Sequence, residues 1–434
     1  MIIVGGGVSG LRLALAGLER GEDVTLVEGR ADLGGLTSTQ ALEVGDETVR
    51  VDRFYHVIME SDTTVRALLD DLGLADRVLW TSAPAELIAD GTPYPASSIV
   101  QMAMLPALEL ADRARIGASL AASLALPLSL ADRTTSASWL RRTAGASAYK
   151  NFWGPILRAK LGTQADRVSA SFIVSTFRRL IQARLKGEGD RFGVLPGGYE
   201  PVFAAMRERF VAQGGRLLTG SPVTTVEREP GPGHPVRVSL ADGTTLESDE
   251  VFLTTPGPVT TRIVPQLTAR ERSQLTSQPY LGVVCGVFLL DTPPNDSYIT
   301  YLVDDVGLTG VIGMHALLPP ERTGGGYLVY LPHYCASDDP WFGEDDDVLA
   351  DRLVVAMRRC FPGYSGRVLA GAVNKAPYVV PLPLPRAEPP LPYETSIPGV
   401  RVVSTAQNRT GTLNVEGSLK MADAALTTLG GQDH

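Results

Sequence analysis

The sequence predicts an α/β fold in which a parallel-sheet domain alternates along the chain with a second, mixed α+β domain. The first observation is a strand, a glycine-rich turn and a helix in immediate succession over residues 1–20. The second is the return of short apolar strands at 214–226, 251–256 and 400–404. The third is the length, because 434 residues exceed one ordinary core and suggest roughly two or three units.

The N-terminal unit has the pattern of a dinucleotide site. Residues 1–4 predict a buried strand, residues 5–10 supply G-x-G-x-x-G, and residues 11–20 continue with the apolar spacing of a helix. Each glycine has a mechanical reason: Gly5 for the tight turn, Gly7 for close approach of a pyrophosphate, and Gly10 for packing of helix on strand. Val8 and Ser9 then stand at the helix N-terminus, where phosphate binds. This is a Rossmann-like arrangement.

The next strand and its continuation distinguish between dinucleotides. Residues 23–27 form the second strand and end at Glu28, where a carboxylate accepts hydrogen bonds from ribose hydroxyls and disfavours NADP. Gly34-Gly35 follows, with Leu36 and Thr37 directly after it. Here the chain resembles the flavin-dependent amine oxidase, protoporphyrinogen oxidase and phytoene desaturase superfamily. The resemblance implies FAD as the cofactor, with the backbone of the doublet close to the pyrophosphate and ribityl chain.

The resemblance extends to segments further along the chain. Residues 51–56 (VDRFYH) resemble the segment that this superfamily runs past the flavin, and Leu195-Pro196-Gly197-Gly198-Tyr199 resembles its L-x-G-G-[FYM] turn. Val223 resembles the residue whose backbone meets the adenine. A helix over 413–426 is expected to direct its first N–H groups at the flavin, where they stabilise the reduced form. Thr405-Ala406-Gln407 departs from the family's Gly-Asp, which puts that aspartate's role in doubt.

These inferences give a set of cofactor residues and a division into domains. The predicted cofactor-binding residues are Gly5, Gly7, Val8, Ser9, Gly10, Glu28, Gly34, Gly35, Leu36, Thr37, Val223, Gln407 and Leu413. The FAD-binding domain is predicted to comprise residues 1–60, 191–280 and 382–434, and the substrate-binding domain residues 61–190 and 281–381.

The substrate-binding domain is predicted to be helical in its first segment, residues 61–190, and strand-rich in its second, residues 281–381. Helices are expected at 63–72, 108–126, 136–144 and 150–160, and strands at 282–290 and 327–331. The aromatic pair Phe152-Trp153 is expected to be core rather than a substrate cage. The strands would close one side of a pocket.

Three side chains are candidates for catalysis, and each has a structural alternative. Glu60 follows the flavin-adjacent segment and could act as a general base, or it could cap a helix. His56 could handle a proton, or it could be a hydrogen-bonded structural histidine. Arg322, in a glycine-rich loop, could face a substrate carbonyl or carboxylate, or it could be solvated. Many amine oxidases of this family keep a lysine near the flavin, and Lys375 is a possible substitute.

The predicted function is FAD-dependent oxidation of a C–N (amine or amide) or C–C bond of a fairly large, partly apolar metabolite, by hydride transfer. An oxidase of antibiotic biosynthesis, of the lankacidin amide oxidase and macrocyclase type, is one possibility in secondary metabolism. A non-redox mutase resembling UDP-galactopyranose mutase stays open, supported by arginines in the predicted helical segment. These are Arg141, Arg142, Arg158, Arg178 and Arg179. A third alternative is a partner-binding protein that keeps FAD only for structure.

The amino-acid composition limits the classes of molecule that the protein is expected to bind. The net charge of −9, without a long basic run, argues against nucleic acid, so the expected partner is a small-molecule substrate. Cys285, Cys335 and Cys360 lie too far apart for a zinc site or a disulfide framework, so no metal is expected and a cytoplasmic location suits them. Residues 116–130 are too short to span a membrane, and contact with a membrane surface is kept only as a minor alternative. The oligomeric state is left undecided.

Overall fold

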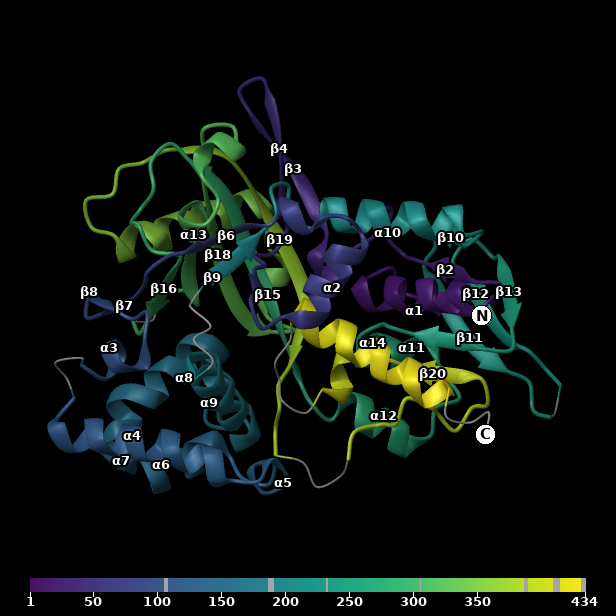
Figure 1. The fold of residues 1–434 in the computed structure, drawn as a ribbon, viewed down its shortest axis with the longest axis horizontal. Helices are drawn as coiled ribbons and strands as arrows, with labels where there is room; N and C mark the ends of the chain where they lie inside the picture. The colour runs from purple at the N-terminus through teal and green to yellow at the C-terminus, as the bar shows by residue number, and fades with distance from the viewer. Residues whose placement is uncertain are drawn as a thin grey trace.

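The computed structural model describes residues 1–104, 108–185, 191–231, 233–304, 306–385, 389–408 and 414–430. Figure 1 shows three parts: a lobe built on a parallel sheet near both termini, a lobe built on a large sheet, and a helical lobe beside it. The predicted α/β class with an interleaved second domain is therefore confirmed.

The first lobe is organised by a five-stranded sheet in which every neighbouring pair is parallel. In spatial order the strands are β10 (Arg216–Leu218), β2 (Thr25–Val27), β1 (Ile2–Val4), β14 (Val251–Leu253) and β20 (Val400–Val402). In chain order this is 3-2-1-4-5, so the order reverses at β1, where dinucleotide sites of this topology lie.

Alternate residues of the parallel strands enter two different cores. Ile3, Leu26 and Phe252 pack against the helices α1 (Val8–Glu19), α10 (Glu200–Ala212) and α14 (Val415–Gly430). Ile2, Val4 and Val251 pack on the opposite side. That side is covered by β11 (Val223–Arg228), β12 (Val236–Leu240), β13 (Thr245–Ser248), α11 (Gly257–Ile263) and α12 (Ala269–Thr276). Because both faces are covered, these strands are continuous apolar runs in the sequence.

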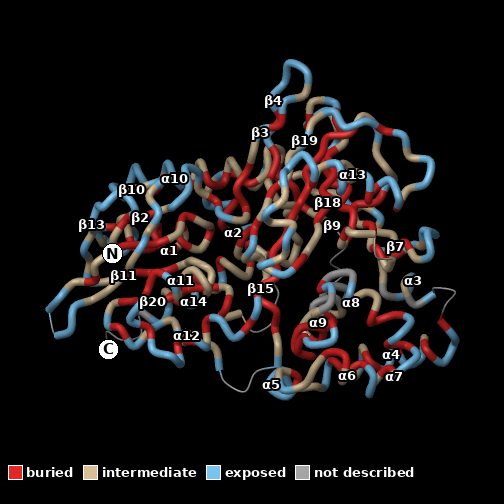
Figure 2. The backbone as a smooth tube through the Cα atoms, turned by 180° about the vertical axis from the view of Figure 1, so that it is seen from behind, coloured by how far each residue is buried: buried red, intermediate tan, exposed pale blue. Residues whose placement is uncertain are grey.

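The second lobe contains a seven-stranded, mostly antiparallel sheet. Its order is β19 (Val368–Pro381), β15 (Tyr280–Leu290), β18 (Tyr327–Ala336), β17 (Gly310–Gly313), β16 (Ile299–Leu302), β7 (Ala85–Ala89) and β8 (Thr92–Pro95). Helix α13 (Asp346–Cys360) covers one face. Every residue of β15 is buried, which explains its uninterrupted apolar sequence (Figure 2). The strand predicted at 327–331 continues to Ala336 because β18 pairs with β15 along its whole length.

The helical lobe is formed by one continuous stretch of chain. Its helices are α3 (Ile99–Ala103), α4 (Leu110–Ala125), α5 (Leu128–Ala131), α6 (Ser136–Thr143), α7 (Gly145–Ala148), α8 (Gly154–Leu161) and α9 (Ala170–Leu185). The helix predicted at 150–160 is divided, with a π-helical turn at Tyr149–Trp153, and Pro155 lies in the first turn of α8. Proline is tolerated in a first turn because no intrahelical N–H is needed there. Within the described ranges, no helix has the length and apolarity needed to cross a bilayer.

The prediction for the aromatic pair in this lobe is confirmed. Phe152 and Trp153 are only 1% and 3% exposed and pack edge to face in the core. They support the fold and do not line a substrate cage.

Smaller elements connect the lobes. They are the hairpin of β3 (Thr39–Val44) and β4 (Glu47–Asp52), the sheet of β5 (Ile58–Met59), β9 (Arg191–Val194) and β6 (Leu79–Ser82), and helix α2 (Thr63–Asp71). All strands of the parallel sheet lie in the segments predicted for the FAD-binding domain. The strands of the seven-stranded sheet lie in the segments predicted for the substrate-binding domain, except that β15 begins one residue earlier. The residue-level domain boundaries remain a prediction.

Glu416, in the first turn of α14, joins the C-terminal helix to α2. Its carboxylate accepts hydrogen bonds from the backbone N–H groups of Thr64 and Val65, both at 2.9 Å, and from the Thr64 hydroxyl. Lys420 forms an ion pair with it at 2.8 Å. Burial opposes ionisation, but the bonds from Lys420, Val65 and Thr64 outweigh it and lower the pKa of Glu416. The carboxylate therefore caps α2 from a distant part of the chain.

We expect Glu416→Ala to lower the free energy of unfolding by about 2 kcal/mol, because it removes a buried ionic cap. Since the folded-state pKa is lowered, this stabilisation is present above the unfolded pKa and is lost as pH falls below it. Urea unfolding at neutral and acidic pH measures both effects. Lys420→Ala is the control, because its side chain is 59% exposed and should contribute less than about 1 kcal/mol. Equal losses in the two variants would contradict the capping role.

Candidate active site

Two glycine loops meet beyond the carboxyl ends of the parallel strands. The N–H of Gly34 donates to the backbone oxygen of Gly6 at 2.9 Å, and Gly7 and Gly34 form an isolated parallel bridge. A Cβ on Gly35 would lie 3.6 Å from the Cα of Gly7. The loop after β1 and the predicted doublet are therefore one continuous surface at the edge where α/β folds bind ligands.

The three motif glycines have different structural reasons. A Cβ on Gly10 would lie 1.8 Å from the oxygen of Gly5, so this position must be glycine for α1 to pack on the turn. Gly5 has a φ of +109°, and its Cβ would lie 2.5 Å from the Thr254 hydroxyl. Gly7 differs, because its φ is −75° and its Cβ would meet no atom of the described residues within 4 Å. Open space therefore lies in front of Gly7.

Thr254 was not singled out from the sequence, yet it holds the first loop. Its hydroxyl lies 3.0 Å from the oxygen of Val4 and 3.2 Å from that of Gly5. The sequence signal for it is only its place at the end of β14, the strand next to β1.

Glu28 links the glycine loop after β1 to the segment that precedes β11. Its Oε2 accepts the N–H of Gly6 at 2.6 Å and its Oε1 the N–H of Arg30 at 2.8 Å. Its backbone oxygen accepts the N–H of Ser221 at 2.9 Å, just before Val223 begins β11. Glu28 and Val223 thus lie at the same edge of the sheet, as a nucleotide extending from the glycine loops would require.

The side chains of several other predicted cofactor residues form contacts within the protein itself. The Ser9 hydroxyl donates to the oxygen of Ser418, that of Thr37 donates to the oxygen of Gly34, and Val8 is part of the core. Ligand contacts at these positions would use backbone N–H groups, which have no intrahelical partner in the first turn of α1. Leu36 packs with apolar side chains of the neighbouring lobe.

Gln407 is committed to its own turn, Thr405–Gln407. Its Oε1 accepts the N–H of Ser404 at 2.7 Å, and its Nε2 donates to the oxygens of Val402 and Leu391. The side chain is therefore engaged by nearby backbone, and a contact between Gln407 and the cofactor stays a prediction. Leu413 lies outside the described residues, and the helix predicted over 413–426 is described from Val415.

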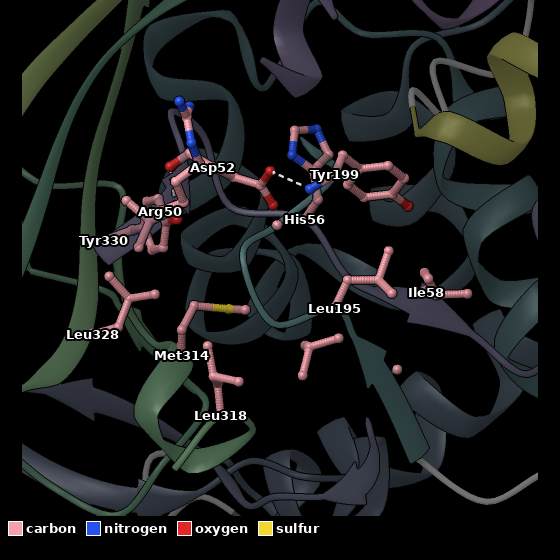
Figure 3. A pocket seen from close by; sticks show the side chains of 14 residues that line it. Arg50, Asp52, His56, Ile58, Leu195, Tyr199, Met314, Leu318, Leu328 and Tyr330 are labelled. Atoms are coloured by element: carbon pink, nitrogen blue, oxygen red, sulfur yellow. Dashed lines mark hydrogen bonds between the residues drawn. The ribbon is translucent and has the colours of Figure 1, made fainter. Parts of the chain in front are cut away.

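A small cavity lies between the two sheet lobes (Figure 3). Its volume of about 20 Å³ is that of roughly one water molecule. Its polar lining includes Asp52, His56, Tyr199 and Tyr330. Its apolar lining includes Ile58, Leu195, Met314, Leu318 and Leu328. The segment resembling the family's flavin-adjacent stretch and the L-x-G-G-Y turn therefore meet here.

Asp52 holds this region together. Its Oδ1 accepts the N–H of Tyr199 at 2.9 Å, and its backbone oxygen accepts the hydroxyl of Tyr330 at 2.8 Å. Gly198 has a φ of +67°, and a Cβ there would lie 2.3 Å from the Asp52 carboxylate. The glycine before Tyr199 is thus required because a buried carboxylate occupies the space of a side chain.

Burial governs the protonation of the two titratable groups in the cavity wall. Asp52 and Tyr199 are only 7% and 4% exposed. Burial raises the pKa of Asp52 to about 7, although the hydrogen bond from the Tyr199 N–H opposes this increase. Burial lowers the pKa of His56 to about 4, although a bond with the Phe54 backbone opposes this. His56 is therefore neutral at neutral pH, and its enclosed Nδ1 has no hydrogen-bond partner among the described residues. In the tautomer that carries its proton on Nε2, this nitrogen can accept a hydrogen bond.

The structure separates the three catalytic candidates. His56 lines the cavity, whereas Glu60 does not and instead forms an ion pair with Arg191 at 3.4 Å, with 27% of its side chain exposed. Strand β5 lies between them and pairs with β9, so it carries Glu60 to the end where Arg191 lies. Arg322 is exposed in a turn that packs beside the β3–β4 hairpin, where Gly324 approaches Val49. Neither Glu60 nor Arg322 meets His56 in this cavity.

Lys375 does not replace the flavin-adjacent lysine. Its ammonium group binds the backbone oxygen of Glu344 and the carboxylate of Asp346 at the start of α13. The preceding residue, Asn374, accepts a hydrogen bond from Arg53. Because neighbouring residues of a strand face opposite sides of a sheet, Lys375 faces away from the segment that contains His56.

Two of the arginines that kept the mutase alternative open have structural partners. Arg141 pairs with Asp166 and stacks over Tyr149. Arg178 donates to the backbone oxygens of Ser123, Leu124 and Leu126 at the end of α4. Arg142 and Arg158 are exposed, and the side chain of Arg179 lies outside the described residues.

Comparison with known proteins agrees with this geometry. The sequence pattern of the family described as flavin containing amine oxidoreductase matches residues 8–420. Coproporphyrinogen III oxidase of Propionibacterium freudenreichii subsp. freudenreichii is 24% identical over 362 residues, which are 68% of this chain and 65% of that relative. The match thus spans less than two thirds of the relative's length.

Solved structures share the fold over nearly the whole chain. An oxidoreductase from Methanosarcina mazei has a TM-score of 0.73 at 16% identity, covering 98% of this chain and 99% of the other. Reduced UDP-galactopyranose mutase has a TM-score of 0.73 at 15% identity, with 99% and 95% covered. Putrescine oxidase bound to putrescine has a TM-score of 0.69 at 17% identity, with 99% and 98% covered. Since oxidases and a mutase share the fold, the fold does not fix the reaction.

We expect the stability of Asp52→Asn relative to the wild type to rise with pH. The folded-state pKa of about 7 lies above the unfolded value of 3.8, so the wild type loses stability as pH rises through about 7. The ionised carboxylate should cost on the order of 4 kcal/mol at high pH, and asparagine keeps the acceptor for Tyr199 without that cost. Urea midpoints of both proteins at pH values below 5 and above 8 measure the difference. Asp46→Asn, at an exposed turn, is the control; a pH-independent difference for Asp52→Asn would show that Asp52 titrates normally.

Proposed function

This chain belongs to the family of flavin-containing amine oxidoreductases, and from that membership we propose that it oxidises a C–N or C–C bond of a fairly large, partly apolar metabolite. It is an FAD-dependent oxidoreductase. Bound FAD supplies the acceptor for a hydride. The tasks left to the chain are to hold the cofactor, orient the substrate, exclude water and handle a proton.

The two joined glycine loops fit the phosphates of FAD. Open space in front of Gly7, next to the first turn of α1, leaves room for a pyrophosphate on unpaired N–H groups. The Glu28 carboxylate has lone pairs beyond those that its two backbone donors occupy, so it would accept ribose hydroxyls as well, and the backbone at Val223 would meet the adenine. The flavin end would then extend past Gly34 and Gly35 toward the antiparallel sheet.

The observation that carries the substrate class is the apolar junction between the cofactor loops and that sheet. Leu36, Phe54, Tyr55 and Val57 belong to one cluster with β15 and β18, and all four are partly exposed. The Tyr55 hydroxyl lies 3.4 Å from that of Tyr334. A molecule bound here would meet aliphatic and aromatic carbon with a few hydroxyls, which suits a bulky apolar metabolite better than a small ionic one.

Within this proposal His56 is the group that handles the proton. It is neutral at neutral pH and lies in the loop between Tyr55 and Val57, so its ring can accept a hydrogen bond from the reacting region. Glu60 and Arg322 would act at most from outside the cavity.

The function is tested by adding candidate amines, amides and apolar metabolites to the purified protein under anaerobic conditions. Bleaching of the visible flavin absorbance by one substrate class, and its return in air, would establish an oxidase for that class. Bleaching without return in air would indicate a dehydrogenase with another acceptor. Turnover of a nucleotide sugar that requires chemically reduced flavin, with no bleaching by any donor, would replace the proposal with the mutase alternative.

Two variants test the assignment of His56 with the same substrate. We expect His56→Asn to slow anaerobic flavin reduction by roughly 100-fold while FAD stays bound, as for loss of a proton-handling group. Glu60→Gln should change the rate less than about twofold, since an exposed ion pair contributes little. The reverse ranking would return the role to Glu60.

Gly7→Ala is expected to leave the fold intact and to reduce FAD content strongly. A φ of −75° tolerates alanine, and its Cβ clashes with no described residue, so only a ligand in front of the loop should detect it. The ratio of flavin to protein absorbance and the thermal midpoint without added FAD measure the two effects. Gly343→Ala, equally unobstructed, is the control. Full FAD content in Gly7→Ala would contradict the proposed position of the pyrophosphate.

A further inference from the structure

More than half of the exposed large apolar side chains among the described residues belong to the helical lobe. Of eleven such side chains among the described residues, six lie between residues 100 and 130, with exposed fractions from 38% to 81%. These six are Val100, Met104, Leu110, Leu124, Leu128 and Leu130. The other five are spread over α10, α13 and β19. Such a concentration of exposed apolar side chains in one lobe makes it a candidate for an interaction surface.

Helix α4 presents a continuous apolar face to solvent. Residues 110, 114, 117, 121 and 124 are all exposed, and their spacing of four and three places them on one side of the helix. They are leucine, alanine, glycine, alanine and leucine. At about 100° per residue, Arg113 borders this face on one side, whereas Arg115 lies about 140° from its centre and packs beside Gly145. Ile116, Ser119 and Ser123 face the core.

The charge of this part of the chain is opposite to that of the rest. Residues 99–185 contain 12 Lys and Arg against 4 Asp and Glu, a net charge of +8. The whole chain carries −9, so the remainder carries −17. Exposed members of the basic set include Arg115, Arg133, Arg142 and Lys150, and Arg133 follows Leu130 by three residues. The lobe lies at the lower edge in Figure 1, away from the chain termini.

We propose that α4 and α5 dock the protein on the surface of an anionic phospholipid bilayer. Exposed leucines would enter the boundary between head groups and acyl chains, while exposed basic side chains of the lobe, such as Arg133 beside α5, would bind lipid phosphates. The charge selects this occupant over a second copy of the chain. A two-fold symmetric contact would bring the same positively charged surface against itself, and like charges would oppose it. A helix in the interface plane needs no spanning length, so this mode agrees with the absence of a spanning helix among the described residues.

Sedimentation with vesicles tests the proposal on the FAD-loaded protein. Vesicles of phosphatidylcholine alone are compared with vesicles that contain about one third phosphatidylglycerol. We expect at least about tenfold stronger partitioning to the anionic vesicles, with a decrease as salt is raised. Leu124→Glu/Leu130→Glu should reduce binding about tenfold or more.

A matched variant controls for nonspecific effects of added charge. Val348→Glu/Val355→Glu replaces side chains that are 52% and 49% exposed on α13, against 52% and 53% for Leu124 and Leu130. It should bind as the wild type does, and flavin absorbance should confirm that both variants fold. Equal binding to both vesicle types, or equal losses in the two variants, would overturn the proposal. So would a dimer in light scattering that Leu124→Glu/Leu130→Glu dissociates while vesicle binding is absent.

Discussion

A buried carboxylate at the end of β4 joins the two sheet lobes. Asp52 accepts a hydrogen bond from Tyr199, which precedes α10 of the parallel-sheet lobe, and its backbone accepts the hydroxyl of Tyr330 on β18 of the other lobe. Because burial disfavours its ionised form, the group is held by hydrogen bonds and not by an opposite charge. The need for glycine at 198 follows from the place of this carboxylate.

The glycine loops form a second junction, and it is built from backbone rather than side chains. Gly6 bonds to Gly34 and to Glu28, and Thr254 fixes the turn from the neighbouring strand. Each close approach excludes a Cβ at Gly5 or Gly10, whereas Gly7 faces open space. The same sequence motif thus contains positions required for folding and a position left for a ligand. A dinucleotide can then bind to the N–H groups of a rigid scaffold without rearranging it.

The candidate site was only partly predictable from the sequence. His56 was expected and lines the cavity, but Glu60, four residues away, is carried by β5 to an exposed ion pair with Arg191. Lys375 and Gln407 have the right chemistry, yet Lys375 faces α13 and Gln407 caps its own turn. Side-chain direction depends on strand register and on partners distant in the chain, and a single sequence does not contain these in readable form.

The sequence by itself determined the cofactor lobe, because glycine spacing and apolar strand patterns are local requirements of one backbone geometry. It also determined the helical character of the first segment of the substrate-binding domain and the core role of Phe152 and Trp153. Only the tertiary structure decided that Asp52 is buried between the lobes, that Glu416 caps α2, and that the apolar face of α4 is exposed. These features depend on contacts between residues up to about 350 positions apart, and burial, unlike local pattern, is set by everything that packs against a residue.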